Sequence, residues 1–393
     1  MMRIALQMLI GDAAKFFGIL FGLTFASLLI TQQLSIFVGL MTRTHSFISD
    51  TGQADLWVMD PNVRYIDEVE PMRSTALQRT RSVAGVEWAV PLFTGLVRSR
   101  LRSGHFRSIY VIGIDDATLV GGPPRMLEGS LSDLRRADGI IVDIHSANKQ
   151  LRQPVERRPD GSPKPGTAWR PLQVGDTLEI NDNRAVVVGI CRSTRALLAY
   201  PKIYTTYSRA VRFSPPLRKK LSYVLVKAAE GVPHAELAER IAARTELKAR
   251  TREQFEWDTM DYYMENTGIP INFGIAVVLG FIVGVAIAGQ TFYNFTLDNI
   301  RYFGALKAMG ASNGLLLRMV LLQALFVGVN GYGLGLGAAA LFGLAVQGSP
   351  LAFRMIWHIP VLTGVAVGII CALSAFVSMI KVMRLEPAVV FKG

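Results

Sequence analysis

The chain has 393 residues, half of them apolar, and a formal net charge of +12. Its mean hydropathy of +0.32 is high for a soluble protein. The basic excess is split between two parts of the chain. No helix-turn-helix, zinc pattern or aromatic-interleaved basic patch accompanies it, so the composition argues against a nucleic-acid-binding protein.

Four apolar runs with few or no charges are each long enough to cross a bilayer, which takes about 20 residues. They cover residues 16–38, 271–295, 315–346 and 361–380. A polar segment between the first two runs is long enough to fold around a core of its own. The sequence therefore predicts an integral membrane protein with four transmembrane α-helices and a large α+β extracytoplasmic domain between the first two of them.

The N-terminal residues 1–15 mix apolar and charged side chains, as an interfacial helix that leads into a span would. The first apolar run lies where a signal peptide would lie. Its apolar core is longer than that of a signal peptide, however, and no clear small-residue cleavage site follows it. We therefore expect an uncleaved first span.

Within the polar segment, alternating and β-branched residues predict strands, and apolar side chains at helical spacing predict helices. Strands are expected at residues 55–59, 86–101, 106–115, 139–143, 202–207, 223–228 and 247–251. A hairpin is expected over residues 178–189, with Asp182 and Asn183 at its turn. Helices are expected at residues 69–80, 234–245 and 253–265, and a mobile loop rich in Pro, Gly, Arg and Lys at 150–169. The last of these helices is expected to run on into the second span as one rigid rod.

Every span carries a pair of glycines four residues apart, which allows helix backbones to approach closely. The pairs are Gly18 and Gly22, Gly280 and Gly284, Gly331 and Gly335, and Gly364 and Gly368. Glycine is common in membrane helices, so one pair alone is a weak signal. Pairs in all four spans favour a tightly packed bundle or dimer.

Between the second and third spans, Ile300, Phe303, Leu306 and Met309 recur at helical spacing. This pattern predicts a short amphipathic helix at the membrane surface. The alternative is a basic loop that only fixes the topology of the spans.

Basic residues flank the spans on one side, and the short loop 347–360 on the other side carries only Arg354. This positive-inside bias places both termini in the cytoplasm and the large domain in the periplasm of a bacterial cell. The flanking basic residues are Arg3, Lys15, Arg301, Lys307, Arg318, Lys381, Arg384 and Lys392.

The sequence lacks the patterns of several catalytic classes. It has no Walker-type phosphate loop, no Gly-x-Ser-x-Gly and no histidines at metal-ligand spacing. Ionisable residues are almost absent from the spans, which argues against an ion-coupled carrier. Cys191 and Cys371 lie in different segments, so no disulfide is expected. We expect neither catalytic nor metal-binding residues in this chain.

The stretch from Leu306 to Ser312, Leu-Lys-Ala-Met-Gly-Ala-Ser, resembles the cytoplasmic coupling segment of FtsX/MacB-type permeases of ABC transporters. The plan of one span, a large periplasmic domain and three further spans is also similar to theirs. The segments 53–60 and 251–255, together with Gly284, resemble the DevC branch. One departure is Tyr302, because many relatives have an acidic residue there.

The resemblance implies a non-catalytic permease subunit that dimerises and sits on two copies of a separate ABC ATPase, which would hold the ATP and Mg²⁺. It implies an exporter whose coupling helix passes movement to the periplasmic domain, a mechanism called mechanotransmission, and a membrane-fusion (adaptor) protein leading to an outer-membrane duct. The alternative is an FtsX-like transmembrane regulator of a periplasmic cell-wall hydrolase. The implied coupling residues are Asp298, Arg301, Tyr302, Phe303, Gly304, Leu306, Lys307 and Gly310.

These expectations divide the chain into seven parts. They are the interfacial helix and first span at 1–41, the periplasmic domain at 42–268, the second span at 269–297, the coupling helix at 298–313, the third span at 314–347, a periplasmic loop at 348–359, and the fourth span with a cytoplasmic tail at 360–393.

Overall fold

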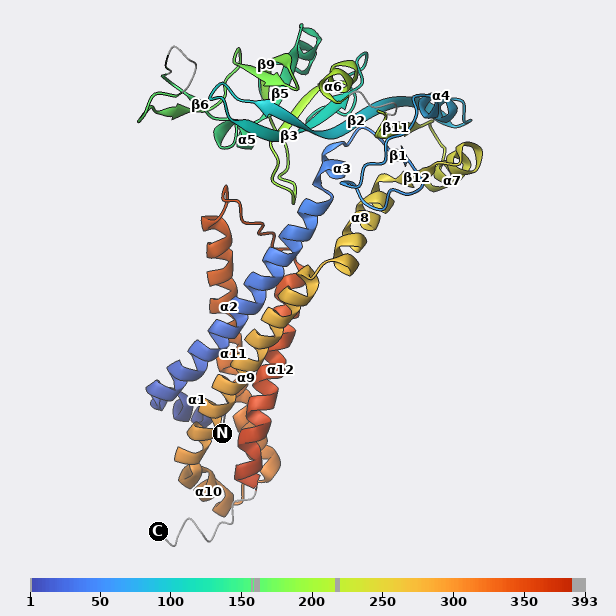
Figure 1. The fold of residues 1–393 in the computed structure, drawn as a ribbon. Coiled ribbons are helices and arrows are strands. Elements are labelled where there is room, and N and C mark those ends of the chain that lie inside the picture. The colour runs from blue at the N-terminus through green and yellow to red at the C-terminus, as the bar shows by residue number, and fades with distance from the viewer. Residues whose placement is uncertain (1, 157, 159–162, 216–219, 384–393) are drawn as a thin grey trace. The chain divides into compact units, whose positions relative to one another are not determined.

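The computed structural model describes residues 2–156, 158, 163–215 and 220–383 (Figure 1). The chain divides into two compact units. We call Met1–Met41 together with Thr267–Gly393 the membrane unit, and Thr42–Asn266 the α+β unit.

The membrane unit contains four long helices that pack side by side as a bundle (Figure 1). Each is long and apolar enough to cross a membrane, which confirms the four predicted spans. The chain is therefore a multi-pass membrane protein. The helices are α2 (Ala13–Thr44), α9 (Ile269–Asp298), α11 (Asn313–Ala345) and α12 (His358–Met383).

Hydrogen bonds between small polar groups join the long helices. Thr31 of α2 donates to Thr363 of α12 at 3.1 Å, and Ser27 donates to the carbonyl of Tyr332 on α11 at 3.1 Å. Tyr332 in turn donates to the carbonyl of Pro360 at 3.0 Å. Such bonds are favourable within a bilayer because no water competes for them.

Two short helices lie at one end of this bundle. The first is α1 (Met2–Gly11), which packs on α11 through buried Ala5 and Leu9. The Ala5 carbonyl also accepts a hydrogen bond from Gln323 at 2.7 Å. Asp12 separates α1 from α2 and caps α2, since its carboxylate accepts from the Lys15 backbone N–H at 3.3 Å. The second short helix, α10 (Ile300–Ala308), connects α9 to α11.

The α+β unit is built on a 10-stranded sheet of order β12-β1-β11-β2-β3-β10-β5-β9-β4, with β8 paired to β2 and β9. Most pairs are antiparallel, but β10 pairs with β3, and β5 with β9, in parallel. The strands are β1 (Leu56–Met59), β2 (Val86–Arg100), β3 (Phe106–Ile114), β4 (Arg125–Glu128), β5 (Gly139–Asp143), β8 (Thr177–Ile180), β9 (Asn183–Arg192), β10 (Lys202–Thr206), β11 (Tyr223–Ala228) and β12 (Lys248–Thr251).

Helices cover this sheet and bury apolar residues against both faces. On one face Trp57 packs edge-on against Phe47 and Tyr223 and lies 5.7 Å, centroid to centroid, from Phe255. The helices are α3 (Ser46–Asp50), α4 (Thr75–Arg81), α5 (Ile144–Asn148), α6 (Tyr207–Phe213), α7 (His234–Thr245) and α8 (Arg252–Asn266), with a 3₁₀ helix η1 (Leu131–Arg135).

The α+β fold and most of the predicted strands are confirmed, as is α7, but three local predictions are wrong. The helix expected at 69–80 begins only at Thr75, because Met72 forms a bridge to Leu221. The hairpin turn lies one residue earlier than predicted, at Asn181 and Asp182, which have φ of 46° and 62°. The stretch expected to be a loop contains a two-stranded ribbon, β6 (Gln153–Pro154) with β7 (Trp169–Arg170), although residues 157 and 159–162 lie outside the described chain.

The rigid rod predicted from the α+β unit into the second span is also wrong. Helix α8 ends at Asn266 and α9 begins at Ile269. Gly268 caps α9, and Pro270 occupies its first turn. Proline lacks the N–H that a continuing helix would need there, so it starts helices rather than extending them. Helix α2 is uninterrupted from Ala13 to Thr44.

Candidate functional site

Helix α10 has one buried and one exposed face. Phe303, Gly304 and Leu306 are buried in the core of the membrane unit, whereas 63% of Tyr302 is exposed. The predicted amphipathic helix is therefore confirmed, except that Met309 is 75% exposed. Met309 follows the last helical residue, so the helical spacing that predicted its burial no longer applies to it.

The ends of α10 are fixed by local chemistry. Asn299 stands between α9 and α10 and donates to the Phe295 carbonyl at 2.9 Å. At the other end, Gly310 has a φ of +94°, a left-handed conformation that glycine adopts at little cost. Ala311 then donates back to the Leu306 carbonyl at 3.0 Å. Gly310 thus ends α10.

A groove of about 640 Å³ lies between α1 and α10, and we call it the α1–α10 groove. Its floor is mostly apolar, and two carboxylates stand beside it. Lys15 forms ion pairs with both of them, Asp12 and Asp298. The lining residues are Gln7, Met8, Gly11, Asp12, Asp298, Asn299, Tyr302, Ala305, Leu306 and Met309.

The structure brings together only part of the predicted coupling set. Asp298, Tyr302 and Leu306 share the α1–α10 groove. Arg301 and Lys307 belong to α10, like Tyr302 and Leu306, but they do not line the α1–α10 groove. The contribution of α1 was missed, because a contact between residues so far apart in sequence leaves no trace in the spacing of the coupling segment.

Several predicted glycines lie where helix backbones cross closely. An added Cβ would lie 2.5 Å from Ile287 at Gly22, 2.6 Å from Ala26 at Gly284, 2.7 Å from Leu23 at Gly331 and 2.5 Å from Ser27 at Gly335. Gly18, Gly280 and Gly364 have neighbours only at 3.4 Å or more, and Gly368 has none within 4 Å. Gly39 and Gly328, which were not predicted, are as tightly packed as Gly331.

One face of α11 has glycines that do not lie at a helix crossing. Gly333 and Gly337 alternate with the packed Gly331 and Gly335, yet a Cβ added at either would lie more than 4 Å from every other helix or loop among the described residues. Helix α11 therefore carries two glycine faces, one packed on α2 and one open.

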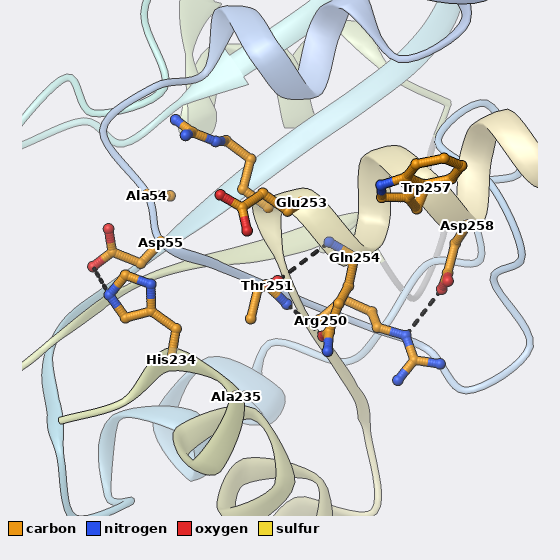
Figure 2. A pocket seen from close by; sticks show the side chains of 11 residues that line it. Ala54, Asp55, His234, Ala235, Arg250, Thr251, Glu253, Gln254, Trp257 and Asp258 are labelled. Carbon is orange, nitrogen blue, oxygen red and sulfur yellow. Dashed lines mark hydrogen bonds and ion pairs between the residues drawn. The ribbon is translucent and has the colours of Figure 1, made fainter.

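The α+β unit has a polar groove of about 790 Å³, shown in Figure 2, which we call the β1–α8 groove. It brings together the two segments, 53–60 and 251–255, that carry the resemblance to the DevC branch, since β1 and β12 are paired. Thr251 and Gln254 bond reciprocally at the start of α8, with donor–acceptor distances of 3.0 and 3.2 Å.

Ion pairs occupy two carboxylates of the β1–α8 groove, those of Asp55 and Asp258. Asp55 accepts from Lys227 at 3.0 Å. Figure 2 shows Asp55 beside His234, 3.7 Å away, and Asp258 accepting from Arg250 at 2.9 Å. Trp257 is 66% exposed beside them. An exposed tryptophan among charged groups is typical of a surface that binds a protein.

No group of three or more His, Cys, Asp or Glu side chains within the described residues could hold a metal ion. Both cysteines are buried and free. Burial raises the pKa of the Cys191 thiol, which makes it a poor nucleophile.

Two family models match the chain. The MacB-like periplasmic core domain matches residues 16–244, and the FtsX-like permease C-terminal model matches residues 274–387. Uncharacterised ABC transporter permeases from two strains of Mycobacterium tuberculosis are each 27% identical over 329 residues, which cover 82% of this chain and 80% of those proteins. A solved structure, the periplasmic region of MacB from Actinobacillus actinomycetemcomitans, is similar with a TM-score of 0.35 and 15% identity, over 56% of this chain and 96% of that one.

The first model alone covers more than half of the chain, and the second covers its last three long helices. The first match covers most of α2 and of the α+β unit, and the second lies in the C-terminal part of the membrane unit. The chain therefore belongs to the family of FtsX/MacB-type ABC transporter permeases.

Proposed function

We propose that this chain is the transmembrane permease subunit of an ABC exporter, and that a separate ATPase docks on its α1–α10 groove. The observation that carries the proposal is the groove itself. It exposes Tyr302, Ala305 and Met309, while the opposite face of α10 is buried in the bundle. A helix with this division can bind a partner and pass movement to the helices behind it.

The charges at this end of the bundle support a cytoplasmic location in the inner membrane. Lys15, Arg301, Lys307 and Arg318 all belong to it, whereas Arg354 is the basic residue of the loop between α11 and α12. By the positive-inside rule the groove then faces the cytoplasm and the α+β unit faces the periplasm. Both termini are cytoplasmic in this arrangement.

The buried contacts of α10 supply a route for movement. Phe303 and Leu306 belong to the same apolar core as Phe292 and Phe295 of α9 and Leu316 and Met319 of α11. A displacement of α10 must therefore repack the ends of two spans, because close-packed side chains transmit displacement. We propose that this is how ATP hydrolysis on the partner is coupled to the periplasmic side.

Tyr302 stands where many relatives have an acid, but the α1–α10 groove still contains carboxylates. Asp298 and Asp12 line it beside Tyr302, and only one cation, Lys15, is ion-paired with them in the described chain. We propose that these carboxylates attract a basic segment of the ATPase and that Tyr302 supplies apolar contact area. ATP and Mg²⁺ would bind to the ATPase alone.

The remaining partners follow from the same proposal. A second copy of the chain is proposed, and the open glycine face of α11, Gly333 and Gly337, supports it. A periplasmic adaptor leading to an outer-membrane duct is proposed as in the DevC branch, and Trp257 in the β1–α8 groove supports a protein partner there.

A matched pair of substitutions on α10 tests the docking site. Ala305 is exposed and lines the groove, while Ala308 is exposed on the same helix outside it. Ala305→Arg should weaken binding of the co-purifying ATPase to the chain in nanodiscs by about tenfold or more, since an arginine would fill the groove and leave its charge poorly solvated. Ala308→Arg should change binding less than about twofold. Equal losses in the two variants would refute docking in the groove.

The proteins that co-purify distinguish export from regulation. An adaptor protein that elutes with the chain and its ATPase would support the exporter. A cell-wall hydrolase in its place would favour the FtsX-like regulator, which uses the same coupling helix but transports nothing.

Charge reversal gives a second test of coupling. Reversal at both Arg301 and Lys307 should uncouple ATP hydrolysis from export while the protein still inserts in the membrane. Normal export by that double variant would remove both residues from the coupling role.

A further inference from the structure

The α+β unit contains a second, smaller cavity of about 230 Å³. Apolar side chains form most of its wall, among them Phe47, Leu96, Tyr110 and Leu198. Two charged residues, Asp67 and Lys202, also line it. We call it the Lys202 cavity. It shares no lining residue with the β1–α8 groove.

Lys202 is unusual because a lysine is rarely fully buried without an ionic partner. It is only 6% exposed, and its ammonium donates to the Thr194 carbonyl at 2.9 Å. No carboxylate of the described residues lies within 4.0 Å of it. An ammonium has three N–H donors, so this single bond leaves hydrogen-bonding capacity unused. Burial accordingly lowers the pKa of Lys202.

Asp67 is the opposite charge in the same cavity. Its carboxylate accepts one hydrogen bond, from the Tyr263 hydroxyl at 3.1 Å. A carboxylate has about four acceptor sites, so most of its capacity is also unused. Burial raises the pKa of Asp67. Asp67 and Lys202 are not paired with each other, since no oxygen of one lies within 4.0 Å of the nitrogen of the other.

Lys202 is buried and Asp67 is half-buried, and neither has a direct ion pair. Asp50, Asp143 and Asp67 stabilise the Lys202 ammonium through space, but burial outweighs them. Charges placed in this way are costly for the fold because they lose hydration that is only partly replaced. Sites with this kind of perturbed charge are enriched in binding and catalytic pockets. Ordered water in the cavity would satisfy the charged groups but not the apolar wall. Leu96 and Leu198 at that wall are 52% and 47% exposed, and this apolar surface favours a ligand with an apolar part.

The wall of the cavity is anchored by hydrogen bonds. The segment after β9 contributes Ala196 and Leu198, and Thr194 at its start donates twice to Asp50, at 2.7 and 2.8 Å. Near its end, the Ala199 carbonyl accepts from Gln150 at 2.6 Å. A wall held in this way offers a preformed cavity, which lowers the entropic cost of binding.

We propose that the Lys202 cavity binds a small amphiphile whose headgroup is neutral overall and offers both an acceptor to Lys202 and a donor to Asp67, as a carboxamide or a zwitterionic amino acid does. The lining carries one charge of each sign, and the nearby Asp50 and Asp143 already accept hydrogen bonds from Thr194 and Ser193. This arrangement favours a neutral or zwitterionic headgroup over an ion. A cavity of about 150 Å³ holds benzene, so this one suits a ligand of roughly 8 to 10 non-hydrogen atoms. The inference concerns the α+β unit alone and does not depend on the proposed docking of an ATPase.

Protection of an introduced cysteine tests the proposal with the full chain in nanodiscs. Ala196→Cys places a thiol in the cavity with little change in volume, while the native Cys191 and Cys371 are buried. The rate at which a water-soluble maleimide modifies it is measured against hexanamide, L-norleucine, hexanoate and hexylamine. Hexanamide or L-norleucine should give half-protection at a concentration about tenfold lower than the two singly charged probes, since an ion leaves one lining charge unpaired. Equal protection by all four probes, or by none, would overturn the proposal.

Substitutions then identify the groups responsible. Lys202→Met and Asp67→Asn should each raise the half-protecting concentration by about tenfold. Lys227→Met is the matched control, because Lys227 is paired with Asp55 and does not line the cavity. Leu96→Trp, at a partly exposed position, should abolish protection by filling the space even if Lys202→Met fails to fold. Full protection of a folded Leu96→Trp variant would show that the probes bind elsewhere and overturn the proposal.

Discussion

The two units of this permease are stabilised by different interactions. In the membrane unit, glycines such as Gly335 bring helix backbones together, and hydroxyl pairs such as Thr31 with Thr363 join them. In the α+β unit, a hydrogen-bonded sheet buries large side chains, and it also holds charged groups such as Asp176 and Lys202 out of water. Lipid is as apolar as the helices, so close fit must stabilise the first unit, whereas burial from water stabilises the second.

The largest expected effect tests close fit on the two glycine faces of α11. Gly335→Leu should destabilise the membrane unit by about 3 kcal/mol or more, because even a Cβ there would lie 2.5 Å from Ser27 and 2.6 Å from the Thr24 carbonyl. Gly337→Leu, one half-turn away with nothing within 4 Å, should not destabilise the chain. Thermal unfolding of both variants in the same detergent measures the difference.

The same pair also reports on assembly. If the open face contacts a second copy, Gly337→Leu should lower the dimer fraction in nanodiscs without lowering the unfolding temperature. A similar loss of thermal stability in both variants would mean that close fit at the α2 crossing is not what stabilises this bundle.

A smaller effect is expected from breaking a partly buried ion pair in the α+β unit. Asp176 is 7% exposed and accepts two bonds of 2.6 Å from Arg170 and one of 2.8 Å from the Gln173 N–H. Arg170→Met should cost about 2 kcal/mol at neutral pH, since it leaves a carboxylate with too few partners out of water. Lys164→Met removes an exposed pair with Glu156 and should cost less than about 0.5 kcal/mol. Urea unfolding followed by tryptophan fluorescence compares them.

The pH dependence of that cost has a defined sign. Burial acts to raise the pKa of Asp176, but the bonds from Arg170 and Gln173 outweigh it and lower the pKa below the usual 3.8. A lowered carboxyl pKa adds stability above the unfolded-state value, and that stability is lost as the pH falls through the folded-state value. The difference between the native chain and Arg170→Met should therefore shrink in acid, and a difference that stays constant with pH would contradict the assignment.

The sequence predicts the elements that local periodicity determines. Four apolar runs identified α2, α9, α11 and α12, and helical spacing gave α7 its observed bounds. Helix α6 was missed because it begins at Tyr207, directly after β10, and its first residue continued the β-like composition. The hairpin turn was displaced by one residue because Asn181, Asp182 and Asn183 all suit a turn, and only the strand pairing decides between them.

The sites were less predictable than the elements. The position of α10 was evident from its amphipathic spacing, but the groove also needs α1, which lies about 290 residues earlier in the chain. The Lys202 cavity gave no signal, because Lys202 starts an ordinary-looking strand and the other lining residues, such as Phe47 and Asp67, are far away in sequence. Burial of a charge is a tertiary property that neither composition nor periodicity records.

The smallest expected effect tests whether the negative charge of Asp67 lowers the free energy of unfolding of the α+β unit. Burial raises the pKa of Asp67, so the folded chain binds a proton there more tightly than the unfolded chain does. The contribution of Asp67 to the free energy of unfolding is then favourable in acid and is lost as the pH rises from the unfolded pKa of 3.8 through the raised folded pKa.

Asp67→Asn keeps the shape of the side chain but carries no charge. Its free energy of unfolding should therefore exceed that of the native chain by about 1 kcal/mol at neutral pH and by nothing in acid. Asp261→Asn, at an exposed position on α8, should change stability by less than about 0.5 kcal/mol at either pH. Urea unfolding at the two pH values makes the comparison, and a native chain that is more stable than Asp67→Asn at neutral pH would show that Asp67 and Lys202 already stabilise each other without a ligand between them.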